Sequence, residues 1–281
     1  MHFDDLKQWI GRTESASGVA AAAPLDGLAA TLDHESPPWT PGCAPPLAHW
    51  LYLLPQARQS DLAEDGHPHR GGFLPPVELP RRMWAGSAIE FHAPVRIGDR
   101  LRRDSAISSI EHKSGQSGDL VFVTVTHAWS TAAGPVLTER QDIVYRAASK
   151  PDAIDRRLAA SPVLRRADWT RQIHPDPVLL FRFSALTFNA HRIHYDRSYC
   201  TGVEGYPGLV VHGPLTAMLL MDLFARNRPD ARIAAFSFRG RRPLFDTESF
   251  TLCGSMRAGG ADLWAVDGSG NVAMTAELVL Q

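Results

Sequence analysis

The chain has 281 residues, of which 44% are hydrophobic and 21% are charged. This length fits one large domain or two medium ones, and this composition is typical of a globular protein. The formal net charge is −1, so no overall electric field favours nucleic acid or an anionic membrane surface. We therefore expect neither nucleic acid nor a membrane as a partner.

The start of the chain and its cysteines indicate a cytoplasmic protein. The first residues, MHFDDLKQWIG, lack the basic start and the apolar core of a secretory signal. No apolar run reaches the roughly 18 residues that a membrane-spanning helix needs. The three cysteines, at positions 43, 200 and 253, are far apart and form no CxxC pair. This pattern argues against both disulfides and a structural zinc site.

The first half is predicted to hold one helix, two long loops and then strands. Alanine and leucine dominate residues 23–34 and favour a helix, whereas residues 35–55 and 65–82 are rich in proline and glycine and favour loops. Loops this long in a compact domain are usually functional. From residue 83 the apolar and polar residues alternate, which predicts three or four antiparallel strands up to residue 146.

The second half is predicted to repeat this plan after a polar, basic linker over residues 147–176. LLFRFSALTFN, residues 179–189, is predicted to be a strand. GPLTAMLLMDLFARN, residues 213–227, is apolar on most sides and is predicted to be a buried helix. Four alternating segments follow between residues 233 and 280 and predict four more strands.

The two halves can be aligned with each other, which predicts an α+β fold made of two tandem units, residues 1–146 and 177–281. Each unit is expected to wrap a curled antiparallel sheet around a helix. The segments that match in pairs are 23–32 with 213–223, 93–107 with 241–255, and 134–145 with 270–280. The first unit has no counterpart of FNAHRIHYD, residues 188–196, so we expect one active site per pair of units.

FNAHRIHYD combines residues that suit several kinds of chemistry. His191 and His194 are three apart and can face one metal ion, but Arg192 between them disfavours a cation, and the third ligand would have to be Asp196 or a distant residue. No GxSxG motif indicates a nucleophilic serine. Acid/base catalysis by a histidine is the interpretation that remains. Asn189 can orient a water or a ring nitrogen, but its amide cannot accept a proton.

A second motif supports this interpretation. YPGLVVHGPLTAMLL, residues 206–220, places a His212-Gly213 pair at the start of the predicted buried helix. The N-terminus of a helix offers free N–H groups and the positive end of the helix dipole. Glycine allows a substrate to approach the backbone closely. The pair therefore suits the binding of a thioester oxygen that becomes an enolate.

Together these motifs resemble the hot-dog fold hydratases and dehydratases of the MaoC type, whose motif runs Asp-x-Asn-Pro-x-His before a His-Gly pair. The resemblance places His194 on the catalytic histidine and Gly213 on the oxyanion donor. Asn189, His191 and Arg192 replace the acid, the asparagine and the proline of that motif. The altered motif and the stretch DGHPHRGGFLPPVELPRRMWAG, residues 65–86, resemble one double hot-dog branch. That branch comprises mesaconyl-CoA and itaconyl-CoA hydratases and mitochondrial-type 3-hydroxyacyl-thioester dehydratases, and the resemblance covers roughly residues 5–281.

The resemblance implies hydration of a short dicarboxylic or branched enoyl-CoA, such as itaconyl-CoA or mesaconyl-CoA, to a product of the citramalyl-CoA or malyl-CoA type. It implies no cofactor beyond the coenzyme A of the substrate, no metal, and a homodimer. Two alternatives stay open at this point. One is a 3-hydroxyacyl-thioester dehydratase of fatty-acid synthesis, and the other is a non-catalytic protein that binds acyl-CoA.

Further residues are candidates for substrate binding. A second carboxylate on the substrate favours an arginine, because the guanidinium matches its geometry. The candidates for this contact are Arg192 and Arg82. Other candidate binding residues are Arg239 and Arg241 for coenzyme A phosphates, Trp84 for the acyl pocket, and His212. His191 and Tyr195 are candidate binding residues as well. Because position 189 lacks the acid, either His194 carries out both proton transfers through a water, or His191, Tyr195 or Asp196 supplies the second group.

Overall fold

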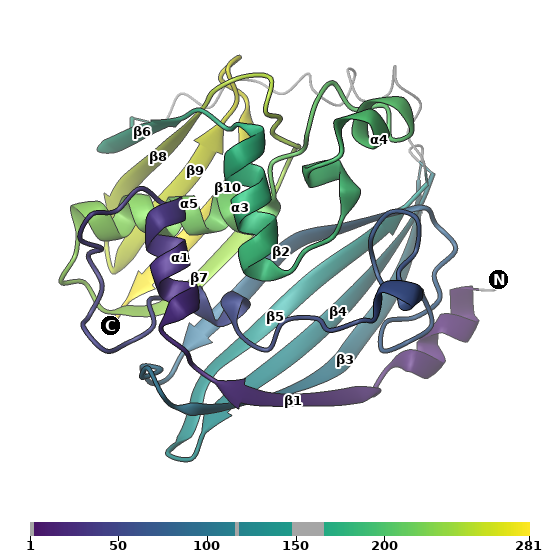
Figure 1. Ribbon diagram of the computed structural model, residues 1–281, viewed down its shortest axis with the longest axis horizontal. Coiled ribbons are helices and arrows are strands. Elements are labelled where there is room, and N and C mark those ends of the chain that lie inside the picture. Colours follow the sequence, from purple (N-terminus) through teal and green to yellow (C-terminus); the bar gives the residue numbers. More distant parts are fainter. Residues whose placement is uncertain (1–2, 116–117, 148–165) are drawn as a thin grey trace.

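The computed structural model describes residues 3–115, 118–147 and 166–281, and its main feature is one antiparallel sheet (Figure 1). The ten strands lie in the order β1-β3-β4-β5-β2-β7-β10-β9-β8-β6. In that order they comprise Thr13–Val19, Arg100–Gly115, Gly118–Thr131, Gly134–Arg146, Arg81–Phe91, Ile233–Gly240, Val272–Leu280, Gly260–Val266, Phe250–Arg257 and Trp169–Ile173. The strands predicted between residues 83 and 146 and between 233 and 280 are therefore present.

The sheet consists of two halves with the same internal order. The first half runs 1-3-4-5-2 and the second runs 6-8-9-10-7, so that β2 and β7 meet in the middle. These two strands pair antiparallel, from Gly86 opposite Arg239 to Glu90 opposite Ala235. Two tandem units with one joined sheet are what the internal repeat predicts, and the predicted α+β class is confirmed.

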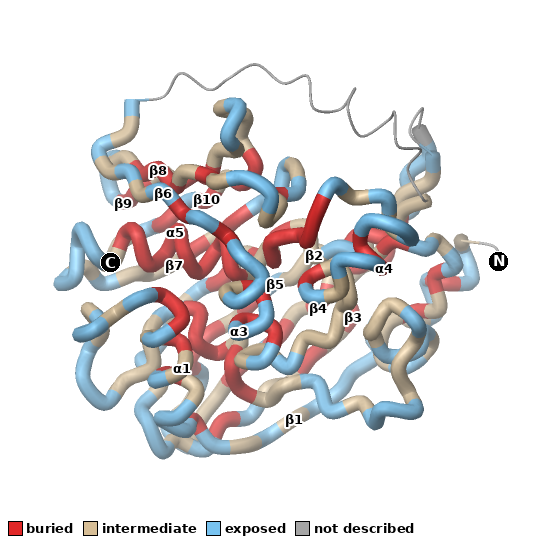
Figure 2. Tube along the Cα trace, turned by 45° about the horizontal axis from the view of Figure 1, so that its top comes forward, coloured by how far each residue is buried: buried red, intermediate tan, exposed pale blue. Residues whose placement is uncertain are grey.

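The helices of the described residues are α1 (Ala23–Thr31), α3 (Pro177–Thr187), α4 (Arg197–Gly202) and α5 (Gly213–Asn227). Short 3-10 helices are η1 (Phe3–Trp9), η2 (Ala48–Leu51), η3 (Gln59–Asp61) and η4 (Arg192–His194). Helix α5 packs against β6, β8, β9 and β10, and every residue from Leu215 to Phe224 is buried (Figure 2). The predicted buried helix is therefore correct. No helix among the described residues is long and apolar enough to cross a membrane.

The prediction that residues 23–32 match the buried helix is wrong. Helix α1 follows β1 as α3 follows β6, and α1 and α3 lie side by side (Figure 1). Their contact is close, because a Cβ atom at Gly27 would lie 2.7 Å from Leu186 Cδ2. Helix α5 has no counterpart among the described residues of the first half, where the chain between α1 and β2 is rich in proline. Proline has no N–H group to continue a helix.

The predicted strand over residues 179–189 is also wrong, because this segment forms most of helix α3. The side chain of Asp176 caps the helix by accepting a hydrogen bond of 2.7 Å from the Leu179 N–H. Pro177 then occupies a first-turn position, where a missing N–H costs nothing. The buried residues Leu180, Phe183 and Ser184 follow helical spacing.

The predicted linker contains a strand. Strand β6 pairs with β8, from Trp169 opposite Gly254 to Ile173 opposite Phe250. Residues 148–165 of the predicted linker lie outside the described residues. In the first half, η1 and the segment around residues 73–79 cover a second apolar cluster on β3, β4 and β5. This segment continues from the Gly-rich loop that reaches the candidate site.

Candidate active site

The FNAHRIHYD motif begins where α3 ends. Phe188 has a φ of 49°, a left-handed conformation that ends the helix and turns the chain. Asn189 then stabilises the turn, because its Oδ1 accepts a hydrogen bond of 3.0 Å from the His191 N–H. The following 3-10 turn, η4, places His194 in the protein interior with 7% of its surface exposed.

His194 is held in one orientation and one tautomer. Its Nδ1 lies 2.7 Å from the carbonyl oxygen of Val210, and since a carbonyl can only accept, Nδ1 carries the proton. The other ring nitrogen, Nε2, therefore has a lone pair. Burial lowers the pKa of His194 to about 4, although the bond to Val210 opposes this shift. At neutral pH His194 is thus an uncharged base.

His212 lies directly against His194. The two rings stack with centroids 3.7 Å apart and planes 18° apart. His212 is 1% exposed, and its Nε2 lies 2.8 Å from the Ser184 hydroxyl. Burial lowers its pKa well below the ordinary value, and the neighbouring His194 lowers it further. The structure places His212 beneath His194 as a packing partner, so the predicted role of His212 in substrate binding gains no support.

Helix α5 begins at Gly213, immediately after His212. The His212 side chain does not cap the helix, and the Gly213 N–H donates no hydrogen bond to any described residue. The Gly213 N–H at the start of the helix therefore stays available to a ligand. A Cβ atom at Gly213 would lie 3.8 Å from the carbonyl oxygen of Trp84 on β2, so the site adjoins the first half of the sheet.

A loop of the first half covers the motif. The carbonyl oxygen of Asp65 accepts a hydrogen bond of 2.9 Å from the Arg192 N–H. Gly66 has a φ of 90°, and a Cβ atom there would lie 1.8 Å from the Ala190 carbonyl oxygen. Only glycine fits this position, because it combines a positive φ with contact to backbone. Residues 64–67 and 190–192 are therefore fixed against each other.

This contact places His67 beside the motif histidines. Its ring lies 4.1 Å from the ring of His191, which in turn lies 5.4 Å from the ring of His194. We call the four histidines His67, His191, His194 and His212 the histidine row. His67 Nδ1 lies 2.9 Å from Asp65 Oδ2, and the His67 N–H donates to Asp65 Oδ1 at 2.9 Å.

The sequence predictions contained neither Asp65 nor His67 as a site residue. The signal that was available is the combination of Asp, Gly and His in a loop too rich in glycine and proline to be a regular element. The length of this loop indicates a function and its sequence carries the family resemblance, but nothing local indicates which residues the loop contacts.

Arg82 lies beside the histidine row and beside Tyr145, where its positive charge opposes the burial that raises the pKa of the Tyr145 hydroxyl. This arginine lies on β2, is half-buried, and forms no ion pair with a carboxylate among the described residues. Its charge contributes to the lowered pKa of both His67 and His191, although burial is the larger cause for each. The predicted interaction of Arg82 with a substrate carboxylate therefore has a suitable position.

Arg192, the other residue predicted to bind a substrate carboxylate, already forms hydrogen bonds within the protein. Its Nε and Nη2 donate to Asp196 Oδ2 at 3.0 and 2.7 Å, and its Nη1 donates to the Glu64 carbonyl at 3.2 Å. Its guanidinium also lies 4.1 Å from the Tyr199 ring centroid. All three nitrogens thus hold the loop in shape. Tyr195 is 46% exposed and donates to the Ala190 carbonyl, so it too supports the loop.

The remaining predicted binding residues lie near the junction of the two halves. Trp84 packs against Trp50 and Phe238, with ring centroids 5.0 and 5.9 Å away. Its Nε1 donates to Gly86 O and Ser87 Oγ, so the indole is oriented within an aromatic cluster close to Gly213. Arg239, opposite Gly86 in the sheet, and Arg241 are both exposed.

Three side chains of the site have the spacing of a metal site. One ligand atom each from Asp65, His67 and His191 lies within 4.8 Å of the other two. Two observations disfavour a cation there. Asp65 Oδ2 and His67 Nδ1 already satisfy each other, and the positive charge of Arg82 acts on the same histidines. These three side chains are therefore better suited to transferring protons, or to lying beside an anion, than to binding a metal ion.

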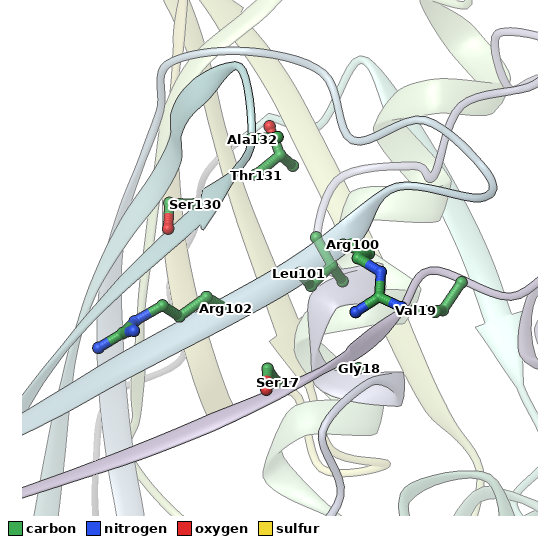
Figure 3. A pocket seen from close by; sticks show the side chains of 9 residues that line it. All are labelled: Ser17, Gly18, Val19, Arg100, Leu101, Arg102, Ser130, Thr131 and Ala132. Carbon is green, nitrogen blue, oxygen red and sulfur yellow. The ribbon is translucent and has the colours of Figure 1, made fainter.

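A separate open pocket lies at the edge formed by β1, β3 and β4 (Figure 3). It contains no histidine or carboxylate, and no member of the histidine row lines it. Its lining residues are Ser17, Gly18, Val19, Arg100, Leu101, Arg102, Ser130, Thr131 and Ala132. It offers no group for proton transfer.

Solved structures show the fold of the protein. A MaoC-like dehydratase superimposes with a TM-score of 0.71 at 16% identity, covering 96% of this chain and 98% of that chain. A Mycobacterium tuberculosis protein described as having a double hotdog fold gives a TM-score of 0.60 at 13% identity, covering 100% of this chain and 98% of that one. The predicted MaoC-like double hot-dog fold is confirmed.

Sequence relatives define the family. The family model for hydroxyacyl-thioester dehydratase type 2 matches residues 47–246. The chain is 49% identical over 277 residues to the mesaconyl-C(4)-CoA hydratase of Chloroflexus aurantiacus, with 98% of each chain covered. It is 26% identical over 262 residues to a mitochondrial hydroxyacyl-thioester dehydratase type 2 of Schizosaccharomyces pombe, covering 82% of this chain and 86% of that one. The chain belongs to the hydroxyacyl-thioester dehydratase type 2 family, and the prediction of a hydro-lyase is confirmed at the level of this family.

Proposed function

We propose that the protein is an acyl-CoA hydratase that adds water to the C=C bond of a short dicarboxylic enoyl-CoA. The observation that carries this proposal is the pairing of a buried, uncharged His194 with the free helix start at Gly213. The relative at 49% identity is named mesaconyl-C(4)-CoA hydratase, which supports the same activity.

The chemistry follows from this pairing. The thioester oxygen accepts a hydrogen bond from the Gly213 N–H, so that negative charge can develop on it. His194 Nε2 takes a proton from a water molecule as the water oxygen attacks the β-carbon. The electron pair of the C=C bond moves toward the thioester and forms an enolate. A proton delivered to the α-carbon then restores the carbonyl group and completes the hydration.

The position of Arg82 supports a dicarboxylic substrate. A half-buried arginine with no carboxylate partner among the described residues lies beside the histidine row, and a planar guanidinium binds a carboxylate through two parallel hydrogen bonds. A second carboxylate on the acyl group would neutralise this charge. Itaconyl-CoA and mesaconyl-CoA both carry such a group, and we propose them as substrates.

Incubation with itaconyl-CoA, both mesaconyl-CoA thioesters and crotonyl-CoA tests the proposal, with products identified by mass spectrometry. We expect faster turnover of at least one dicarboxylic thioester than of crotonyl-CoA. Absence of turnover with all of them would overturn the proposed function.

A second candidate function is a 3-hydroxyacyl-thioester dehydratase of fatty-acid synthesis, which the names of the family and of the yeast relative favour. It predicts a preference for longer, uncharged acyl chains and no dependence on Arg82. A non-catalytic acyl-CoA-binding protein is the third possibility, and unchanged rates in His194→Ala would favour it.

We also propose a homodimer located in the cytoplasm. Helix α3 and its C-cap expose three large apolar side chains, Val178, Phe181 and Phe188, each more than 60% exposed. An exposed apolar stripe of this kind is typical of an interface between subunits. Light scattering coupled to size-exclusion chromatography measures the mass of the assembly and tests this proposal.

A further inference from the structure

The proposed hydration needs two proton transfers, and the motif supplies one obvious group, His194. Asn189, at the position of the usual acid, has its Oδ1 occupied by the His191 N–H and carries no exchangeable acid proton. Asp196 accepts hydrogen bonds from Arg192 and caps α4 through the Tyr199 N–H. Neither residue is placed to donate a proton to a substrate.

The four rings of the histidine row differ in their hydrogen-bond partners. His194 touches a backbone carbonyl and His212 touches a serine hydroxyl, both uncharged. The ring of His191 forms no hydrogen bond with any described residue. His67 alone in the row has a carboxylate partner, Asp65. Because an imidazolium in a dry site needs a counter-charge, a proton is held best on His67.

We propose that His67 is the second proton-transfer residue of the reaction and that Asp65 is its positioning residue. This inference rests on the proposed hydratase function. The first unit, which lacks the FNAHRIHYD motif, thereby supplies the second proton-transfer group of the active site in the second unit.

As the water oxygen bonds to the β-carbon, one O–H bond breaks and its proton moves to His194 Nε2. The C=C electron pair becomes the enolate, whose oxygen accepts from the Gly213 N–H. The His67 imidazolium gives its Nε2 proton to the α-carbon, and the thioester carbonyl reforms. One water is added, His194 is protonated and His67 is neutral.

The row then returns the proton. His194 holds it without a counter-charge, whereas His67 has Asp65, so transfer back to His67 is favourable. His191 lies between the two, and one of its ring nitrogens is within 4.8 Å of a ring nitrogen of His67. One water can bridge such a gap. The side chain of His67 is 19% exposed, which also allows exchange with solvent.

The charges around His67 match this role. Burial lowers its pKa most, Asp65 raises it, and Arg82 and Arg70 lower it, with a net lowering. An imidazolium with a lowered pKa is a stronger acid toward carbon. The carboxylate of Asp65 stabilises the protonated ring, so that His67 can still hold its proton. A substrate carboxylate on Arg82 would remove one opposing charge, which favours protonation of His67 once the substrate is bound.

The experiment compares His67→Gln, His67→Ala and Asp65→Asn with the control His69→Gln. His69 is an exposed histidine of the same loop. We expect kcat to fall about 100- to 10,000-fold in both His67 variants, the range for loss of a general acid or base. We expect imidazole in the buffer to restore part of the His67→Ala rate. His69→Gln should keep the wild-type rate.

Asp65→Asn separates positioning from structure. Loss of the carboxylate removes the counter-charge, so the high-pH limb of kcat should move to lower pH by about one unit or more. Product binding by calorimetry and the thermal midpoint show whether each variant remains folded. Where Asp65→Asn does not fold, imidazole rescue of His67→Ala shows whether His67 transfers a proton.

Wild-type turnover together with an undiminished rate in folded His67→Gln overturns this inference and leaves the proposed function intact. A diminished His67→Ala rate without imidazole rescue, with an unshifted pH limb in Asp65→Asn, also overturns it. Absence of wild-type turnover overturns the proposed function itself, so the two failures are distinguishable.

Discussion

Gly66 of the first half packs directly against Ala190 of the second, since a Cβ atom at position 66 would lie 1.8 Å from the Ala190 carbonyl oxygen. The neighbouring Asp65 carbonyl binds the Arg192 N–H at 2.9 Å. Position 66 therefore sets how closely His67 approaches the second half. A side chain there must push the loop away.

We expect Gly66→Ala to lower kcat about 100-fold, because a misplacement of about 1 Å in an active site costs this much. The global fold should survive, since the displaced segment is a surface loop. Steady-state kinetics and circular dichroism measure both effects. Gly72→Ala, in the same loop with open space around its Cβ position, is the matched control and should be neutral. Equal rates in both variants would contradict the assigned role of the contact.

Arg82→Gln should change substrate preference. A hydrogen-bonded charge pair contributes about 1.5–3 kcal/mol, which corresponds to a loss of about 10- to 100-fold in kcat/KM. We expect this loss for dicarboxylic acyl-CoA thioesters and little change for crotonyl-CoA. Kinetics with both substrates measure the ratio, and Arg96→Gln, on the exposed loop after β2, serves as control. An equal loss for both substrates would assign Arg82 to general stability.

The sequence indicates the second half of the candidate site most directly. His194 and Gly213 are separated by a short segment, and the structure brings them together because Val210 and His212 both contact His194. The buried helix was readable from its unbroken apolar character. LLFRFSALTFN fits the periods of both a strand and a helix, so its pattern alone does not predict helix α3. The helix start signals Asp176 and Pro177 precede this segment.

The first half of the site depends on a contact between distant parts of the chain, and no local pattern encodes it. Asp65 and His67 lie beside the motif histidines only because Gly66 contacts Ala190. Arg192 illustrates the opposite case. Its pairing with Asp196 at a spacing of four residues was readable from the sequence, and it explains why this arginine is not free to bind a substrate.

The stability of the protein should fall in mild acid. The pKa of His194 is lowered from 6.5 to about 4 in the folded state, so the unfolded chain binds a proton first as the pH falls. Between about pH 6.5 and pH 4 this histidine removes about 1.4 kcal/mol of unfolding free energy per pH unit. The effect is absent above the unfolded pKa and complete below the folded one.

The pKa values of the buried His212 and the half-buried His191 are lowered in the same direction and add to this slope. Denaturant unfolding at several pH values measures it. His194→Gln should have a smaller slope than the wild type over this window. An identical slope in the two proteins would show that His194 is already protonated in the folded state.

Removal of metal ions should leave the activity unchanged. Asp65, His67 and His191 are close enough to share an ion, but the hydrogen bond between Asp65 and His67 and the charge of Arg82 disfavour one. Dialysis against a chelator followed by kinetics tests this, with metal content measured by mass spectrometry. Loss of activity that one divalent ion restores would contradict the proton-transfer assignment of His67.

A buried carboxylate away from the histidine row should affect stability alone. Asp222 on α5 is 3% exposed and accepts hydrogen bonds from Arg171 of β6 at 2.7 Å and from Arg226 at 2.8 Å. His34, just after α1, lies 2.5 Å from it. Asp222 thus joins the central helix to both units.

Asp222→Asn leaves two arginines without their shared counter-charge. Breaking a buried ion pair in this way costs about 3–5 kcal/mol, and the two arginines are partly exposed, so we expect a loss toward the lower end, about 3 kcal/mol. The exposed Asp230→Asn is the matched control. Denaturant unfolding measures the loss, and KM should stay unchanged. A KM that rises with the loss of Asp222 would mean that the orientation of α5, and with it the Gly213 N–H, depends on this cluster.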